Sequence, residues 1–211
     1  MKEKDLNGVF GGNTLLEEDN HPDYTGKKVA VIGGGNVAMD CARTIKRLGA
    51  EKVTVIYRRA EKQMPAETKE IEEAKQEGVQ FLFQTNITKI LGENKVEAIE
   101  CIQMELVEKP GETRKVPIEI PNSNYTLPMD YVVMAVGSKV DLELLEKQNL
   151  PATPKKYLKI NSQNRIEGTN IFAGGDIVGQ IATVAWAASD GRKVAEHIEE
   201  YLDNEICGDT K

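Results

Sequence analysis

The chain has 211 residues, enough for one large or two small domains with a substantial buried core. Its net charge of −7 argues against nucleic acid or an anionic membrane as the main partner. The N-terminal segment is polar, without the apolar core of a signal peptide or anchor, so we expect a cytoplasmic protein with no membrane segment. Cys41, Cys101 and Cys207 are too widely spaced for C-x-x-C chemistry and fit reduced thiols.

The first part of the chain has the alternating strand and helix patterns of an α/β fold. The expected order is an irregular lead-in at 1–26 with a helical piece at 14–18, a strand at 28–32, a helix at 36–48, a strand at 52–57, a helix at 66–77 and a strand at 79–83. Continuous apolar runs at the strands indicate a parallel, Rossmann-like sheet that is buried on both faces.

The middle of the chain changes to an antiparallel pattern. Strands are expected at 86–91, 95–107 and 115–120, and the apolar run at 131–135 returns to the parallel sheet. A β-meander therefore replaces the usual crossover helix. The last quarter predicts a short strand and turn within 155–167, a short buried strand at 169–176 and a long helix at 180–201.

A glycine-rich turn between the first expected strand and helix indicates an anion site. Gly33, Gly35 and Ala38 form the pattern G-x-G-x-x-A. Such a turn lets the backbone approach a pyrophosphate, and the first N–H groups of the helix attract negative charge. The residues expected to contact a dinucleotide here are Gly33, Gly34, Gly35, Asn36, Val37 and Ala38.

The end of the second strand indicates which dinucleotide binds. A site for NAD would carry an acidic residue there to hold the ribose 2′-hydroxyl. This chain instead has Arg58 and Arg59, whose guanidinium groups suit the 2′-phosphate of NADP(H). Adjacent residues on an extended segment point in opposite directions, so one of the two arginines could be a surface residue while the other holds the phosphate.

A second turn lies near the C-terminus, where Gly174, Gly175 and Asp176 precede the long helix. The residues themselves leave two interpretations open. The turn could direct a helix N-terminus at a ligand, or Asp176 could simply cap the start of the helix.

Several strings resemble the small (β) subunit of NADPH-dependent glutamate synthase and its flavoprotein relatives. They are GGGNVAMDCARTIKRLGA, VIYRRAEKQMPAETKEIEEAKQEGVQFLF, MAVGS and NIFAGGDIVGQIATVAWAASDGRKVAEHI. The relatives include the flavin subunit of NADH-dependent ferredoxin-NADP oxidoreductase and the flavin region of dihydropyrimidine dehydrogenase. The resemblance implies hydride transfer from NADPH to FAD and electron flow to iron–sulfur centres in a partner subunit or domain. It also implies cofactor contacts at Gly137, Gly175, Asp176, Ala182, Thr183 and Val184.

The chain departs from this family on the N-terminal side of Lys28, where an FAD fingerprint is expected. Gly8 to Gly12 lack a leading strand and the right spacing. We therefore expect an NADP(H)-binding domain at 27–137 and only the C-terminal portion of a discontinuous FAD-binding domain at 138–211. A fragment of a longer flavoprotein is the favoured explanation over a natural split subunit. The isolated chain is then expected to bind NADP(H), and FAD only with the missing half.

Hydride transfer needs no protein general base, and we assign no catalytic or metal-binding residues. Three alternatives remain. The chain could be a non-catalytic NADP(H)-binding or interaction module, part of another ferredoxin-NADP-type flavin reductase, or a thioredoxin-reductase-like protein, although the last would need a C-x-x-C motif near the NADPH turn. A homodimer through an apolar C-terminal surface is also compatible with the sequence.

Overall fold

The structure is a computed structural model that describes residues 6–18, 21–111, 115–137, 140, 142–180 and 183–208. The chain divides into two compact units, Met1–Gly137 and Ser138–Lys211.

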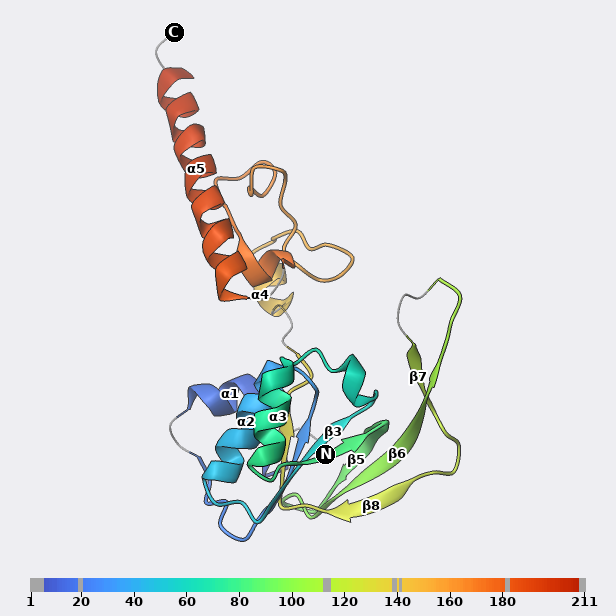
Figure 1. Ribbon diagram of the computed structural model, residues 1–211. Coiled ribbons are helices and arrows are strands. Elements are labelled where there is room, and N and C mark those ends of the chain that lie inside the picture. The colour runs from blue at the N-terminus through green and yellow to red at the C-terminus, as the bar shows by residue number, and fades with distance from the viewer. Residues whose placement is uncertain are drawn as a thin grey trace. The chain divides into compact units, whose positions relative to one another are not determined.

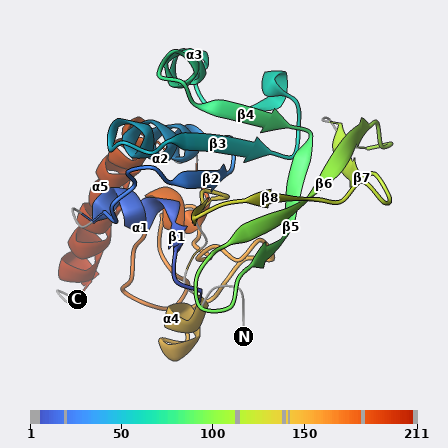
Figure 2. The same ribbon diagram turned by 90° about the horizontal axis from the view of Figure 1, so that it is seen from below.

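The first unit is built on a five-stranded parallel sheet. In spatial order its strands are β1 (Val9–Gly11), β9 (Tyr131–Met134), β2 (Lys28–Ile32), β3 (Lys52–Tyr57) and β4 (Gln80–Phe83). Strands β3 and β4 extend the sheet to one side of β2 and β1 lies on the other side (Figure 2), with β9 between β1 and β2. The order of the strands therefore reverses at β2, and such a reversal is where doubly wound sheets bind ligands.

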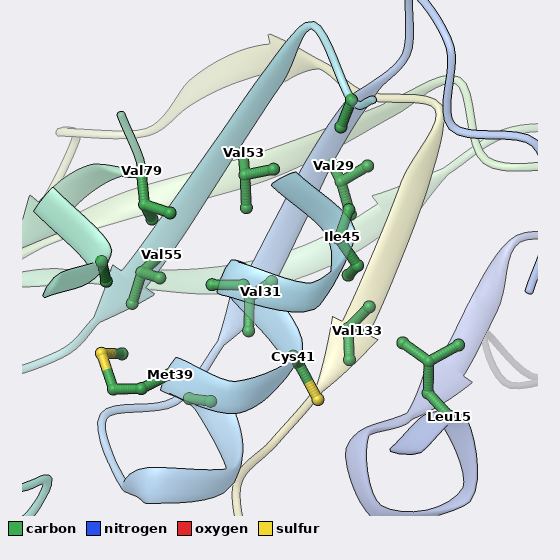
Figure 3. Close-up of a cluster of buried hydrophobic side chains, with 14 of the residues drawn as sticks. Leu15, Val29, Val31, Met39, Cys41, Ile45, Val53, Val55, Val79 and Val133 are labelled. Carbon is green, nitrogen blue, oxygen red and sulfur yellow. The ribbon is translucent and has the colours of Figure 1, made fainter. Parts of the chain in front are cut away.

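Helices cover one face of this sheet (Figure 1). They are α1 (Gly12–Glu17), α2 (Asn36–Arg47) and α3 (Thr68–Gln76). Figure 3 shows the resulting core, in which Met39, Cys41 and Ile45 of α2 pack against valines of β2, β3 and β9. The apolar positions of α2 recur at helical spacing, and the helix ends before Gly49, whose φ of +94° suits glycine.

Charged side chains join α2 to α3 outside this core. Arg43 forms ion pairs with Glu70, Glu73 and Glu77, and Arg47 also pairs with Glu77 at 2.5 Å between Nη2 and Oε1. Much of the charged face of α3 therefore forms ion pairs with the two arginines of α2.

An antiparallel sheet covers the other face of the parallel sheet. Its central strand β6 (Ala98–Val107) pairs with β5 (Thr85–Leu91), β7 (Val116–Glu119) and β8 (Tyr125–Pro128). Ile99 and Cys101 of β6 share a buried cluster with Ile32, Ile56 and Val132 of the parallel sheet. Both faces of the parallel sheet are thus covered, as its continuous apolar strands predict, and the β-meander crossover is confirmed.

Three expectations for this unit need correction. The described part of the lead-in at 1–26 is not irregular, because β1 forms the edge of the sheet beside β9 and the helical piece expected at 14–18 is α1. Strand β8 was not expected, and its alternating exposed and half-buried residues make it a short strand on the meander surface. Helix α3 begins at Thr68 rather than Ala66, and a 3₁₀ turn, η2 (Glu61–Gln63), precedes it.

The second unit has little regular structure besides helices. It contains α4 (Leu142–Lys147), the 3₁₀ turn η3 (Gly175–Val178) and the long helix α5 (Val184–Gly208). Helix α4 was not expected. A small buried cluster gathers Leu145, Leu158 and Ile166.

The expectation of a buried strand at 169–176 is wrong. Within its described residues, Phe172 forms only an isolated bridge with Arg165, and Ile171 is 43% exposed. The strand and turn expected at 155–167 likewise reduce to turns and single bridges, one of them between Ala152 and Leu158. A strand is stabilised by a continuous ladder of hydrogen-bonded neighbours, whereas these segments form only isolated bridges among the described residues.

None of the helices in the described part of the chain is both long and apolar enough to cross a membrane.

Candidate functional site

The glycine turn between β2 and α2 is locked in place by its neighbours in the sheet. Gly33 has a φ of +145°, and its N–H donates to the carbonyl oxygen of Ile56 at 3.1 Å. A Cβ atom at Gly33 would lie 2.2 Å from the carbonyl oxygen of Ala135, just after β9. Gly33 is therefore required by the close approach of three neighbouring strands, whether or not a ligand is bound.

Gly34 and Gly35 differ in what surrounds them. A Cβ at Gly34 would lie 2.6 Å from the ring of Tyr57, so the ring closes one side of the turn. A Cβ at Gly35 would meet nothing nearer than Pro65 Cγ at 4.0 Å, and Gly35 has an ordinary extended conformation with a φ of −94°. The protein itself therefore leaves space at Gly35, where a ligand can approach the backbone.

That space lies at the N-terminus of α2. Gly35 is the N-cap residue and no side chain caps the helix. The N–H groups of Asn36 and Val37 belong to the first turn, where an α-helix offers no acceptor, and the helix dipole favours an anion there. Ala38 is fully buried, so its small side chain serves the packing of α2 on the sheet. The turn thus has the geometry of a phosphate cradle.

The side chain of Asn36 has a role that the sequence did not indicate. Its Oδ1 accepts a hydrogen bond from the backbone N–H of Glu67 at 2.9 Å. The neighbouring N–H of Ala66 donates to the carbonyl oxygen of Gly34 at 3.1 Å. The segment before α3 is consequently tied to the glycine turn at two points.

Arg58 and Arg59 follow β3, at the same edge of the sheet as the glycine turn. Arg58 is exposed, whereas Arg59 is partly buried. The Nε of Arg59 is shielded from solvent and has no hydrogen-bond partner within the described residues. A buried donor without a partner is costly, and an anion beside Arg59 would satisfy it. The structure thus distinguishes two arginines that the sequence left equivalent.

Gly137 ends the first unit beyond β9, also at the carboxyl edge of the sheet. It has a φ of +95° and is exposed, and the preceding Val136 is 66% exposed. The glycine turn, the arginine pair and Gly137 therefore follow three strands that are neighbours in the sheet.

The second unit has a groove of about 590 Å³ of its own. Its lining includes the predicted residues Gly175, Asp176, Thr183 and Val184, together with Phe172, Ala173, Gly174, Ala187, Gly191 and Val194. Ala182, also predicted for this site, lies outside the described residues. The groove therefore collects the predicted residues of this unit that the structure describes.

A buried carboxylate holds the turn at one side of this groove. Asp190 of α5 is 2% exposed, and its Oδ2 accepts a hydrogen bond from the N–H of Gly175 at 3.0 Å. A Cβ at Gly174 would lie 3.1 Å from Asp190 Cβ, so the chain passes close to α5. Sequence reasoning missed Asp190, although an acidic residue within an alanine- and glycine-rich stretch of helix could have drawn notice.

Asp176 does not cap the long helix. It is an exposed residue of η3, whereas α5 begins only at Val184. Thr183 performs the capping, because its Oγ1 accepts from the N–H of Trp186 at 3.3 Å. The capping interpretation of Asp176 is therefore wrong.

The described residues contain no group of three or more side chains suited to hold a metal ion. Cys41 and Cys101 are buried thiols, and burial raises the pKa of Cys41 to about 12 and that of Cys101 to about 11. Both therefore stay protonated at neutral pH, and Cys41 packs in the core as expected. The side chain of Cys207 lies outside the described part.

Known proteins are similar to this chain in sequence. The chain is 38% identical over 189 residues to the NADP(+)-dependent formate dehydrogenase subunit beta of Moorella thermoacetica, covering 89% of this chain and 27% of that protein. It is also 38% identical to the glutamate synthase [NADPH] small chain of Halomonas elongata, covering 88% of this chain and 41% of the relative. The chain thus spans less than half the length of these relatives.

The fold is also found in a solved structure of Mycobacterium tuberculosis FprA in complex with NADPH, with a TM-score of 0.75 and 22% identity. That likeness covers 97% of this chain and 61% of FprA. The family model for pyridine nucleotide-disulphide oxidoreductases matches residues 5–191. This chain therefore belongs to the pyridine nucleotide-disulphide oxidoreductase family.

Proposed function

We propose that the first unit binds NADP(H) and that the chain is the NADPH-binding part of a flavin-dependent oxidoreductase. One observation carries the proposal: an open helix N-terminus at Gly35 and a partly buried Arg59, whose Nε has no partner among the described residues, lie at one edge of the sheet. The pyrophosphate of a dinucleotide fits the first feature, and a 2′-phosphate fits the second. The names of both relatives, which specify NADP(+) and NADPH, support the same nucleotide.

The bound cofactor would supply the hydride, and the residues of this chain would position it. Asn36 and Val37 would donate their backbone N–H groups to the pyrophosphate, while Arg58 and Arg59 hold the 2′-phosphate. With the adenosine end on the β3 side, the nicotinamide end would lie toward β9 and Gly137. No side chain of the chain is assigned an acid or base role.

The second unit is proposed as the C-terminal portion of an FAD-binding domain. Its groove is lined by residues 172–176, which lead into η3, and by Thr183 and the first turns of α5. Asp176 and Thr183 would face the flavin, with Val184 beside them. By analogy with glutamate synthase small chains, FAD would be held together with a further part of the flavoprotein, and electrons would pass to an iron–sulfur subunit or domain. A cytoplasmic location remains part of this proposal.

A non-catalytic module that binds NADP(H) and docks a partner is the second candidate. The specific observation in its favour is the exposed apolar start of α5, where Val184 is 88% and Trp186 43% exposed. A surface of this kind is typical of an interface, including one between two copies of the chain.

Titration calorimetry of the purified chain tests the proposal. NADPH should bind much more tightly than NADH, and little flavin should copurify. Similar affinity for the two nucleotides would contradict the NADP(H) assignment, and a full complement of bound flavin would contradict the need for a further part. Loss of NADPH absorbance on adding free FAD under anaerobic conditions favours the oxidoreductase over the non-catalytic module.

A further inference from the structure

The loop between β3 and α3 folds back over the glycine turn. Its last part, Met64–Glu67, is here called the strap. The N–H groups of Ala66 and Glu67 donate to Gly34 and to the side chain of Asn36, as described above. The strap therefore joins the turn proposed for the pyrophosphate to the loop that begins with Arg58 and Arg59.

Other contacts fix the loop at its two ends. The hydroxyl of Tyr57 donates to the carbonyl oxygen of Gln63 at 2.8 Å, which holds η2 close to the end of β3. Ala66 is buried in the main core, and Met64 packs against it. The N–H of Gln84 donates to the carbonyl oxygen of Arg59 at 3.0 Å. The loop is thus held in place by contacts with β3, with the glycine turn and with Gln84 between β4 and β5.

Two polar atoms inside this loop lack partners among the described residues. They are Arg59 Nε and Gln63 Oε1, and both are shielded from solvent. One belongs to an arginine proposed to hold the 2′-phosphate, and the other to η2. Because both atoms lie inside the closed loop, a loosened loop would let water reach Arg59 and would allow its side chain to take other rotamers.

The hydrogen bond between Asn36 and Glu67 differs from the other ties because it lies on the surface. Both residues are exposed, so either group can bond to water when the other is removed. The bond can therefore be removed without leaving a buried group unpaired, and the fold does not depend on it. The side chain of Asn36 also points to the strap, so its contact with a nucleotide would come from the backbone N–H.

We propose that the side chain of Asn36 is a positioning residue that sets the preference for NADP(H) over NAD(H) by holding the strap, although it touches neither arginine nor the 2′-phosphate. This proposal rests on the proposed function of the first unit. A loop that is closed before binding loses less conformational freedom when the 2′-phosphate arrives. NAD(H) makes no use of the arginines, so it gains nothing from that closure.

The test compares two variants that break the same bond from opposite sides. Asn36→Ala removes the acceptor. Glu67→Pro removes the donor, and the φ of −59° at Glu67 is one that proline adopts. Glu67→Ala keeps the backbone N–H and is the matched control. Calorimetry on the full chain measures the dissociation constants of NADP⁺ and NAD⁺, and circular dichroism confirms the fold of each variant.

The wild-type chain must first prefer NADP⁺, and a chain without that preference would contradict the proposed function itself. If the wild-type chain prefers NADP⁺, Asn36→Ala and Glu67→Pro should each lower the ratio of the NAD⁺ dissociation constant to that of NADP⁺ by about threefold to tenfold, the range of one hydrogen bond. Glu67→Ala should leave it within about twofold. Equal weakening of NADP⁺ and NAD⁺, or no weakening, would overturn the role assigned to Asn36.

A double-mutant cycle with Arg59 gives the second measurement. If Asn36 acts through Arg59, Asn36→Ala should cost no further NADP⁺ affinity in an Arg59→Ala background. Additive losses in the double variant would show that Asn36 acts independently of Arg59, and the inference would then be wrong.

Discussion

The replacement of Arg59 by alanine is the most direct test of the nucleotide site. Arg59 is partly buried and its Nε has no partner in the described part of the chain, so a bound phosphate would gain a shielded, charge-assisted hydrogen bond. Such a bond contributes about 1.5–3 kcal/mol. The loss in NADP⁺ affinity should therefore be about 10-fold to 150-fold, with little change for NAD⁺.

Arg58 provides the comparison within the same chain. It is exposed, and an exposed ion pair contributes about 0–1 kcal/mol, or up to about fivefold in affinity. Calorimetric titrations of both alanine variants with NADP⁺ and NAD⁺, at low and high salt, separate the two contributions because the exposed pair is screened more strongly. Equal losses for both nucleotides in Arg59→Ala, or a larger loss from Arg58→Ala, would refute the assignment.

The remaining predictions concern the glycine turn and the helix pair behind it. Gly33→Ala should lower the melting temperature markedly, because its Cβ would lie 2.2 Å from a backbone oxygen; an unchanged melting curve would contradict this geometry. Gly35→Ala should leave the melting temperature nearly unchanged yet weaken NADP⁺ and NAD⁺ alike in calorimetry, because its methyl group occupies only the space proposed for the ligand. The hydrogen bond from Arg47, together with Arg43, lowers the pKa of Glu77. The interaction of Glu77 with these arginines therefore contributes fully to stability above the pKa that Glu77 has in the unfolded chain, and the contribution is lost as the pH falls through the lower folded value. Urea unfolding should therefore show a stability loss on acidification that shrinks in Arg47→Ala, and an identical loss in both proteins would show that this pair does not contribute.

The central α/β part of the fold could be predicted because its local and global preferences agree. The run from Lys28 to Tyr57 combines strand, glycine turn, helix and strand, and the structure has β2, α2 and β3 there. The strand β1 was missed because it has only three residues and adjoins glycines, so it has almost no periodicity. Its pairing with β9 is a long-range contact that local patterns do not reveal.

The site was predictable in its backbone and less so in its side chains. Glycine spacing located the turn at the N-terminus of α2, but it gave no indication that Asn36 bonds to Glu67 or that Tyr57 covers Gly34. The difference in burial between Arg58 and Arg59 depends on how the following loop folds. In the second unit, the apolar run at 169–176 resembles a buried strand, yet its described part has no sheet to join.

The meander between β4 and β9 has a consequence for the order in which the protein folds. The backbone N–H of Lys28 donates to a carboxylate oxygen of Asp130 at 2.8 Å, although the two residues are 102 positions apart. Contacts at such separation form slowly, whereas the antiparallel pairs of the meander close over shorter distances in the chain. Gly33 lies so close to Ala135, which follows β9, that a Cβ at Gly33 would be 2.2 Å from the carbonyl oxygen of Ala135. The site proposed for the pyrophosphate should therefore be completed late in folding, and nucleotide binding would measure the fraction of chains in which β9 has joined the sheet.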